Sequence, residues 1–243
     1  MTPSKNSTKL NFCVIIKKII REGSMTRKEL KLAAKTQIKG KVFILLLPLV
    51  IVGAISAVIA AISRFTYGVG ILALIIEFPL AIGLALFFIK FARDEKSGME
   101  DLFSQFKDFG RMWEQIKACL IRWLYIFLGL LCFVIPGIII ALRYSLLEYV
   151  MADQPELTGK QAIEECKKLM KGRIDEIFGL YISFIGWFLL SILTCGILFI
   201  YVAPYFTLTV TKYYLAISAE EISAAPASVT APDAKDEKKD DLF

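Results

Sequence analysis

Four ionisable residues stand inside long apolar segments, and they are the chain's candidates for chemistry: Glu77, Arg122, Arg143 and Glu148. A charged side chain in an apolar environment is costly unless it pairs with an opposite charge or serves a function. These residues therefore indicate either ion pairs that fix the register of helices or a polar site between helices, such as an ion path. For Arg122 there is a third interpretation, because a long side chain near the end of an apolar segment can extend its charge into the membrane interface.

Several classes of site are excluded by composition. The chain has no histidine, which rules out His-based general acid–base catalysis and Ser-His-Asp or Cys-His nucleophiles. No acidic cluster or Ser-Lys spacing stands out, so we expect no catalytic residue, no cofactor, no metal and no enzyme activity. The cysteines form no CxxC pair, so we interpret them as small apolar side chains; they are Cys13, Cys119, Cys132, Cys166 and Cys195.

Long apolar blocks, separated by basic connectors, contain the four charged residues. The blocks cover about 42–62, 69–92, 118–151 and 177–217. A hydrocarbon core about 30 Å thick needs about 20 apolar residues per helix, and each block supplies that number or more. Because 56% of all residues are hydrophobic, too many for a soluble domain of this size, we predict an all-α, polytopic transmembrane helix bundle.

The two longest blocks each hold a turn signal. Pro136-Gly137 divides the block at 118–151, and Thr194-Cys195-Gly196 divides the last block. The alternative for 118–151 is one kinked helix, which would leave five spans. We favour about six spans, at 42–62, 69–91, 118–135, 137–152, 174–193 and 197–217.

The charge distribution supports an even number of spans. Lysine and arginine concentrate at the N-terminus, in the connectors 90–117 and 153–175 and in the tail, whereas the three short turns contain only Arg64. By the positive-inside rule, both termini and the basic connectors are cytoplasmic. This placement explains the net charge of +6 without nucleic acid. We expect a multi-pass protein of the bacterial cytoplasmic membrane whose partner is the lipid bilayer, with anionic lipids and a membrane protein as further candidate partners.

Polar helices are predicted beside the spans. Residues 25–41 are rich in helix formers and lead into the first span, where Gly53, Ala57 and Ala61 form a ridge that permits close helix approach. Thr158 and Gln161 have the spacing of a capping box, opening a helix that closes at Lys171-Gly172. An amphipathic helix at the interface or under the bundle is predicted from apolar residues at helical spacing, namely Leu102, Phe103, Phe106, Phe109, Trp113 and Ile116.

Three regions divide the chain: a basic N-terminal extension at 1–24, a transmembrane helical domain at 25–217 and a disordered cytoplasmic tail at 218–243. The extension fits a signal peptide poorly, because no small-residue cleavage site follows its apolar run. It fits an amphipathic surface helix, or a segment upstream of a native start at Met25, which is our hypothesis.

Depth arithmetic predicts two ion pairs. Glu77 lies about 12 Å below the outer end of the second span, and Arg143 about 9 Å below the turn at Pro136-Gly137, at about 1.5 Å per residue. These depths are close enough for Glu77 and Arg143 to pair. Arg122 and Glu148 flank the same hairpin near its inner end and can pair across it.

Several segments, in order, resemble one known family. They are TRKELKLAAK, DLFSQFKDF, IPGIIIALRYSLLEYVMADQP, AIEECKKLMKGR, SFIGWFLLSILTCGI and APYFTLTVTKYY. Together they resemble the bacterial integral membrane family called domain-of-unknown-function family 975, from Met25 to about Leu215. The sequence departs from the family pattern in its N-terminal extension and at Cys166, where the pattern favours serine. The resemblance implies the fold and the membrane location, and the family carries no established activity.

Two functions are compatible with these features. The first is a non-catalytic accessory, scaffold or envelope-associated membrane protein, which fits the absence of catalytic groups. The alternative is a small permease or a lipid- or solute-binding protein with a polar site between helices, which fits Glu77, Arg143 and the proline breaks.

Overall fold

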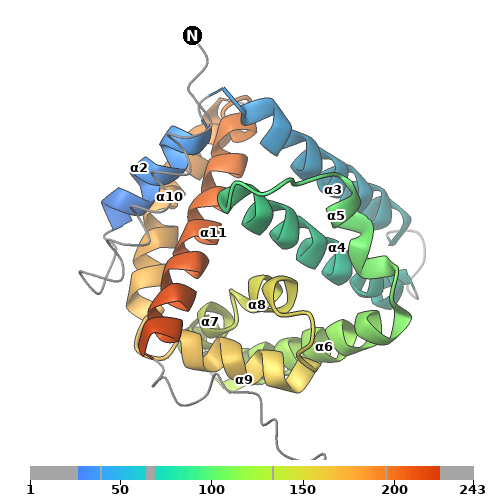
Figure 1. Ribbon diagram of the computed structural model, residues 1–243. Coiled ribbons are helices and arrows are strands. Elements are labelled where there is room, and N and C mark those ends of the chain that lie inside the picture. Colours follow the sequence, from blue (N-terminus) through green and yellow to red (C-terminus); the bar gives the residue numbers. More distant parts are fainter. Residues whose placement is uncertain (1–26, 39, 64–68, 133, 195, 225–243) are drawn as a thin grey trace, which may run out of the picture.

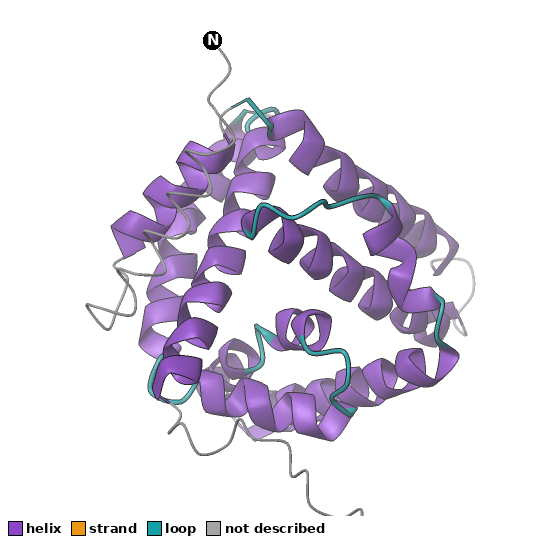
Figure 2. Ribbon diagram, in the orientation of Figure 1, coloured by secondary structure: helices purple, strands orange, loops and turns teal. Residues whose placement is uncertain are grey.

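The computed structural model describes residues 27–38, 40–63, 69–132, 134–194 and 196–224, and all regular elements of these residues are helical. In the view of Figures 1 and 2, α4 and α8 lie inside an outline formed by α2, α3, α6, α9, α10 and α11. The all-α prediction is confirmed for this part of the chain. The N-terminal extension and the turn at 63–68 lie almost wholly outside the described residues.

The helix bounds are as follows: α2 Arg27–Ile38, α3 Val42–Ser63, α4 Val69–Ala92, α5 Glu100–Phe103, η1 Ser104–Phe106, α6 Phe109–Cys132, α7 Val134–Arg143, α8 Leu147–Asp153, α9 Gly159–Leu169, α10 Ile174–Leu193 and α11 Phe199–Ala224.

Helix α4 lies at the centre of the packing, against α3, α6, α8 and α11. Ile82 and Ile89 on one side of it join a large apolar core with α6, α8, α9, α10 and α11. Phe88 and Ala92 on another side join a smaller core with α2, α3 and Leu102. A helix that buries apolar residues on most of its circumference is an interior helix, and α4 therefore organises the bundle.

The block at 118–151 folds as a helical hairpin, as predicted. A Cβ atom added to Gly137 would lie 2.9 Å from the backbone nitrogen of Leu130, so the backbones of α6 and α7 touch. The kinked-helix alternative is wrong, because a single helix cannot pack against itself. The turn lies between α6 and α7, before Pro136, which stands in the first turn of α7, where a missing N–H is tolerated. The second arm is also broken, since α7 and α8 are separated by residues 144–146.

The amphipathic helix expected over the apolar residues between Leu102 and Ile116 is not one helix. Asp108 interrupts it by capping α6: its Oδ1 accepts hydrogen bonds from the N–H groups of Gly110 at 3.0 Å and Arg111 at 3.4 Å. An aspartate that accepts from the second and third residues of a helix is a strong N-cap. The first half of the segment thus forms α5 and η1, and the second half continues without a break into the predicted third span.

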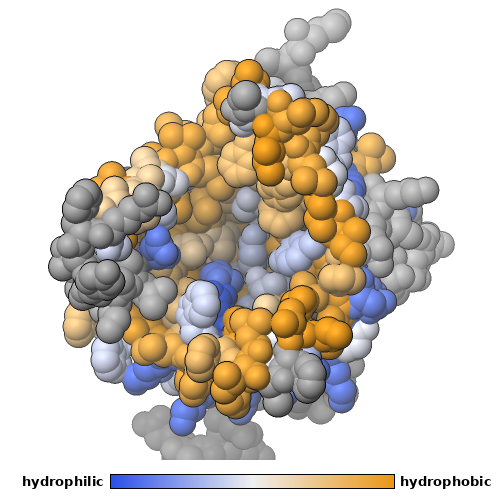
Figure 3. Space-filling model, turned by 180° about the vertical axis from the view of Figure 1, so that it is seen from behind, coloured by the Kyte–Doolittle hydropathy of each residue, from blue (hydrophilic) through white to orange (hydrophobic). Residues whose placement is uncertain are grey.

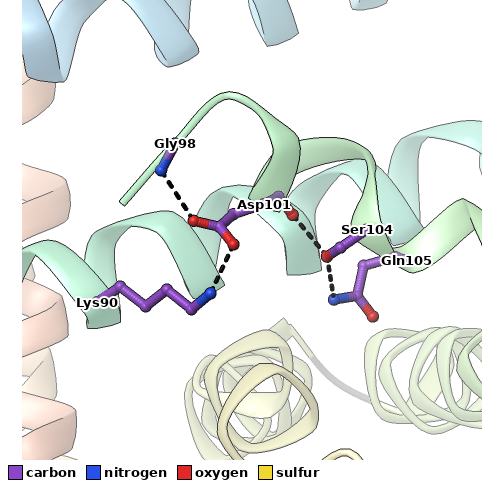
Figure 4. A network of polar contacts seen from close by, with 5 residues as sticks. All are labelled: Lys90, Gly98, Asp101, Ser104 and Gln105. Carbon is purple, nitrogen blue, oxygen red and sulfur yellow. Dashed lines mark hydrogen bonds and ion pairs between the residues drawn. The ribbon is translucent and has the colours of Figure 1, made fainter. Parts of the chain in front are cut away.

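The segment 98–106 is clamped to α4 by polar contacts (Figure 4). The Asp101 carboxylate lies between two donors, Lys90 Nζ at 2.6 Å and the Gly98 N–H at 3.0 Å. Ser104 Oγ donates to the Asp101 carbonyl and accepts from Gln105 Nε2. Gln105 Oε1 in turn accepts from Gln115 Nε2 at 2.7 Å, which ties η1 to α6.

The predicted helix at 158–172 is confirmed as α9, with the capping box of Thr158 and Gln161 in place. Gly172 follows it with φ +76°, the left-handed conformation that suits glycine. The final helix differs from the expectation, because α11 continues to Ala224 rather than ending near 217. Residues 218–224 are therefore helical and not part of a disordered tail.

Candidate functional site

Arg122 and Glu148 form an ion pair between α6 and α8, as predicted. Arg122 Nη1 donates to Glu148 Oε1, and the two side chains are 17% and 19% exposed. The Arg122 guanidinium also lies over the ring of Phe78 on α4, with its Cζ 5.1 Å from the ring centroid, within the range of a cation–π contact. The pair therefore joins three helices in the large core.

The structure does not bring Glu77 and Arg143 together: among the described residues it records no ion pair between them. Counting residues along straight helices places Glu77 and Arg143 at a similar depth. A similar depth does not determine which helices are neighbours. Helix α4, which carries Glu77, packs against α8, whereas Arg143 ends α7. Arg143 Nε is buried without a hydrogen-bond partner, and its carbonyl accepts from Cys166 Sγ at 3.4 Å.

A cavity of about 260 Å³ adjoins the Glu148 side of the ion pair. Helices α4, α8, α10 and α11 and the turn between α7 and α8 line it, and it opens to the outside of the bundle. One part of its wall is polar and the other apolar; the lining residues are Ala81, Leu84, Ala85, Ser145, Glu148, Tyr149, Tyr181, Phe206, Thr207 and Val210. A concave site with a mainly apolar wall and a few polar groups is the usual form of a small-molecule site.

Sequence reasoning found Glu148 but missed the other polar lining residues, Ser145, Tyr149, Tyr181 and Thr207. Single hydroxyl residues in an apolar block more often support helix packing or the interface, so their spacing gives no signal. They come together only because α8, α10 and α11 converge. Figure 3 shows that one face of the molecule is hollowed at its centre, where hydrophilic residues lie inside a hydrophobic surround.

Further ion pairs fasten the helix ends outside the cavity. Arg93, which follows α4, binds both carboxylate oxygens of Asp153 at 2.7 and 2.9 Å, and the Tyr214 hydroxyl donates to the same carboxylate at 3.1 Å. Arg173, before α10, binds Glu220 on α11 at 2.9 Å. Burial raises the pKa of Glu220, and the guanidinium of Arg173 opposes that rise. These contacts hold the ends of α4, α8, α10 and α11 together.

Cysteine and acidic side chains can hold a metal ion if they cluster, and a cysteine such as the buried Cys166 can act as a nucleophile if its thiol ionises. Within the ranges that the structure describes, no group of three or more cysteine, aspartate or glutamate side chains is placed to hold a metal ion. Cys166 is fully buried on α9. Burial raises the pKa of its thiol to about 12, which makes it a poor nucleophile near neutral pH.

Length and composition identify the class of protein. Three helices of the described part are long and apolar enough to cross a membrane: Val42–Ser63, Val134–Asp153 (α7 and α8 together) and Ile174–Leu193. Their exposed residues are largely apolar, as on Phe43, Leu189 and Ile192. The fold is thus an all-helical bundle of the kind found in membrane proteins.

Comparison with known families gives a match over part of the chain. Residues 117–221 match the model of the family described as "Protein of unknown function (DUF975)", so this part of the chain is similar to that family. The match begins within α6 and ends within α11, so it contains Arg122, Glu148 and most of the cavity wall, while the resembling segments before residue 117 lie outside it. Neither a curated protein nor a solved structure matches the chain.

Proposed function

We propose that the chain is a six-span protein of the bacterial cytoplasmic membrane with both termini in the cytoplasm. The spans comprise α3, α4, the hairpin of α6 with α7 and α8, and the hairpin of α10 and α11. The contact between α6 and α7, together with the one between α10 and α11, supports an even number of crossings. Exposed aromatic side chains of Phe109 and Trp113 suit the interface beside the basic residues of the 90–117 connector, where anionic lipids would be attracted.

Cysteine labelling in intact cells tests the topology. Three variants are made, and each contains a single cysteine in an otherwise cysteine-free chain. The cysteine is Cys132 in the first variant, Cys195 in the second and a replacement of Ser228 in the third. Six spans place the first two outside, where a membrane-impermeant maleimide reaches them, and the third inside. The five-span arrangement reverses Cys195 and the tail position, so labelling of the tail from outside would overturn the proposal.

We further propose that the protein acts by binding and not by catalysis: it holds a small molecule in the cavity between α4, α8, α10 and α11. The observation that carries this proposal is the cavity of about 260 Å³ beside Glu148, between helices of the apolar bundle. A charged and hydroxyl-bearing wall in such a place is costly unless it has a ligand or a structural use. This favours the solute- or lipid-binding alternative over the accessory role.

The experiment is purification in native nanodiscs followed by native mass spectrometry. We expect a small molecule to accompany the protein and to be lost from Glu148→Gln. Glu77→Gln is the matched control, because it makes the same change at a carboxylate that does not line the cavity. Retention of the molecule by Glu148→Gln, or its loss from both variants alike, would count against this site.

An accessory role is the second candidate, favoured by the exposure of α3. Leu45 and Pro48 are its buried residues, and the ridge of Gly53, Ala57 and Ala61 is exposed. A membrane partner packed on that ridge should be lost on Ala57→Leu and should appear in stoichiometric amounts with the unaltered chain. If no such protein copurifies, the accessory proposal fails.

A further inference from the structure

We propose that the ligand of the cavity is a compact organic cation with a primary or secondary ammonium group beside an apolar body. This inference rests on the proposed binding function and specifies its ligand. Three features of the cavity wall carry the inference. They are the hydrogen bonds that its hydroxyl groups already make, the charge of Glu148 and the aromatic rings that line the cavity.

The serine and threonine hydroxyl groups of the wall are set to accept hydrogen bonds, whereas the two tyrosine hydroxyls bond neighbouring side chains, Tyr181 to Ser145 and Tyr149 to Thr211. Ser145 Oγ donates its proton to the Leu142 carbonyl at 2.8 Å, and Thr207 Oγ1 donates its proton to the Ala203 carbonyl at 3.0 Å. A hydroxyl has one proton and two lone pairs. Since both protons are engaged by the backbone, each group offers a ligand only its lone pairs. A ligand that brings donors therefore complements Ser145 and Thr207.

The charged side chain that lines the cavity is a carboxylate. Glu148 lines the cavity, whereas its partner Arg122 does not. Arg122 Nη1 engages Oε1 of the carboxylate, and no hydrogen bond to Oε2 is recorded among the described residues. One carboxylate can accept from donors on both oxygens, so a ligand ammonium can bind Oε2 while the pair with Arg122 remains intact. The same carboxylate repels an anion.

Aromatic rings complete the site for a cation. Tyr149, Tyr181 and Phe206 all line the cavity, and the rings of Tyr181 and Phe206 pack with their centroids 5.6 Å apart. Aromatic faces attract ammonium groups, and the attraction grows when water is excluded. The rings and the aliphatic residues Leu84 and Val210 also suit an apolar body next to the charged group.

The size limits the ligand to a compact molecule. The cavity, of about 260 Å³, exceeds the roughly 150 Å³ that holds a benzene molecule. It falls below the range of about 300–1,000 Å³ typical for drug-sized ligands. A whole lipid exceeds this volume, whereas a single ring or a short branched chain with one ammonium group lies within it.

Three probes of matched size test the inference at pH 7 on the full chain in nanodiscs, with empty nanodiscs as the blank. They are benzylammonium, benzyl alcohol and benzoate, which differ mainly in charge, and binding is measured by saturation-transfer NMR and calorimetry. We expect benzylammonium to bind at least tenfold more tightly than benzyl alcohol, and benzoate not to bind. Glu148→Gln should abolish this preference while leaving benzyl alcohol unchanged, and Glu77→Gln should keep it.

A second variant guards against loss of folding in Glu148→Gln. Thr207→Val removes one acceptor with little change of shape, and we expect severalfold weaker binding of benzylammonium with no effect on benzyl alcohol. If benzyl alcohol binds as tightly as benzylammonium, or benzoate binds best, the ammonium inference is overturned while the cavity remains a binding site. If none of the probes binds and no small molecule copurifies, the proposed function fails as well.

Discussion

Helices α4 and α5 approach each other closely at Gly83, where their backbones are in contact. A point substitution at Gly83 can test this packing. A Cβ atom added there would lie 2.1 Å from the Leu102 carbonyl oxygen, 2.7 Å from its carbonyl carbon and 2.9 Å from its Cα. All three are backbone atoms, so no side-chain rotation relieves the overlap. An ordinary carbon–oxygen contact is about 3.3 Å or longer, so Gly83→Ala must separate the two elements by roughly 1 Å.

That separation disturbs contacts on both sides of Gly83. Leu102 is fully buried in the smaller core, and Lys90 and Asp101 bridge the same two elements at 2.6 Å. Overpacking of a core costs about 1–3 kcal/mol, and a backbone obstacle places this case at the upper end. Alanine regains up to about 1 kcal/mol of helix propensity over glycine. The expected net loss is about 2 kcal/mol, or roughly 4–8 °C in Tm for a chain of this size.

The assay is thermal unfolding of the purified protein in a mild detergent, with Gly53→Ala as the control. Gly53 is also inside an apolar helix, and a Cβ atom there would meet nothing within 4 Å, so its Tm should stay the same or rise. Limited trypsin cleavage at the exposed Lys96 supplies a local measure and should be faster in Gly83→Ala. Equal Tm values and equal cleavage rates for both variants would refute the close packing of α5 on α4.

Three further predictions concern single side chains. Arg122→Gln leaves Glu148 without its partner and should lower the free energy of unfolding by about 3 kcal/mol; an unchanged unfolding curve would contradict the pair. The pKa of the Cys166 thiol is raised to about 12, so its thiolate fraction at pH 8 is about 10⁻⁴. Maleimide should therefore label Cys166 over a hundredfold faster after the chain is unfolded. Fast labelling of the folded chain would show that the thiol is accessible. Asp94 has φ 56° just after α4, a conformation that glycine adopts without strain, but its carboxylate also attracts the largely buried ammonium of Lys212. Asp94→Gly should therefore lower the Tm, because leaving a buried charge without its counter-charge costs more than the backbone gains; a raised Tm would show that Lys212 does not depend on Asp94.

Local signals predicted the helices and their breaks well. The turns near Pro136 and Gly196 and the capping box of Thr158 depend on residues that are neighbours in sequence, and the structure contains all three. The error at 100–117 was also local, because Asp108 is a strong N-cap that hydrophobic periodicity does not register. The spacing of apolar residues indicates which face of a helix is buried, whereas an N-cap residue indicates where a helix begins.

The candidate site could be predicted only in part, for a geometric reason. Arg122 and Glu148 lie on the arms of one hairpin, so the chain connection itself brings them together. Glu77 and Arg143 lie on α4 and α7, which α5, η1 and α6 separate in the chain. Depth leaves the rotation and the neighbours of each helix undetermined. The cavity needs residues from four helices, and no pattern in one sequence specifies such a convergence.

The Arg122–Glu148 pair can be explained by structure or by ligand binding, and the cavity separates the two explanations. A pair that only fixes helix register can be replaced by apolar residues of similar volume at little or no cost in stability. The pair here is asymmetric: Arg122 is held against Phe78 away from the cavity, while Glu148 lines it. An ion pair that only fixes helix register needs no such asymmetry. A cation site needs a carboxylate at the cavity wall and a fixed positive charge on the side of the carboxylate away from the cavity. The arrangement therefore supports binding as the reason for a charged pair at this place in the bundle.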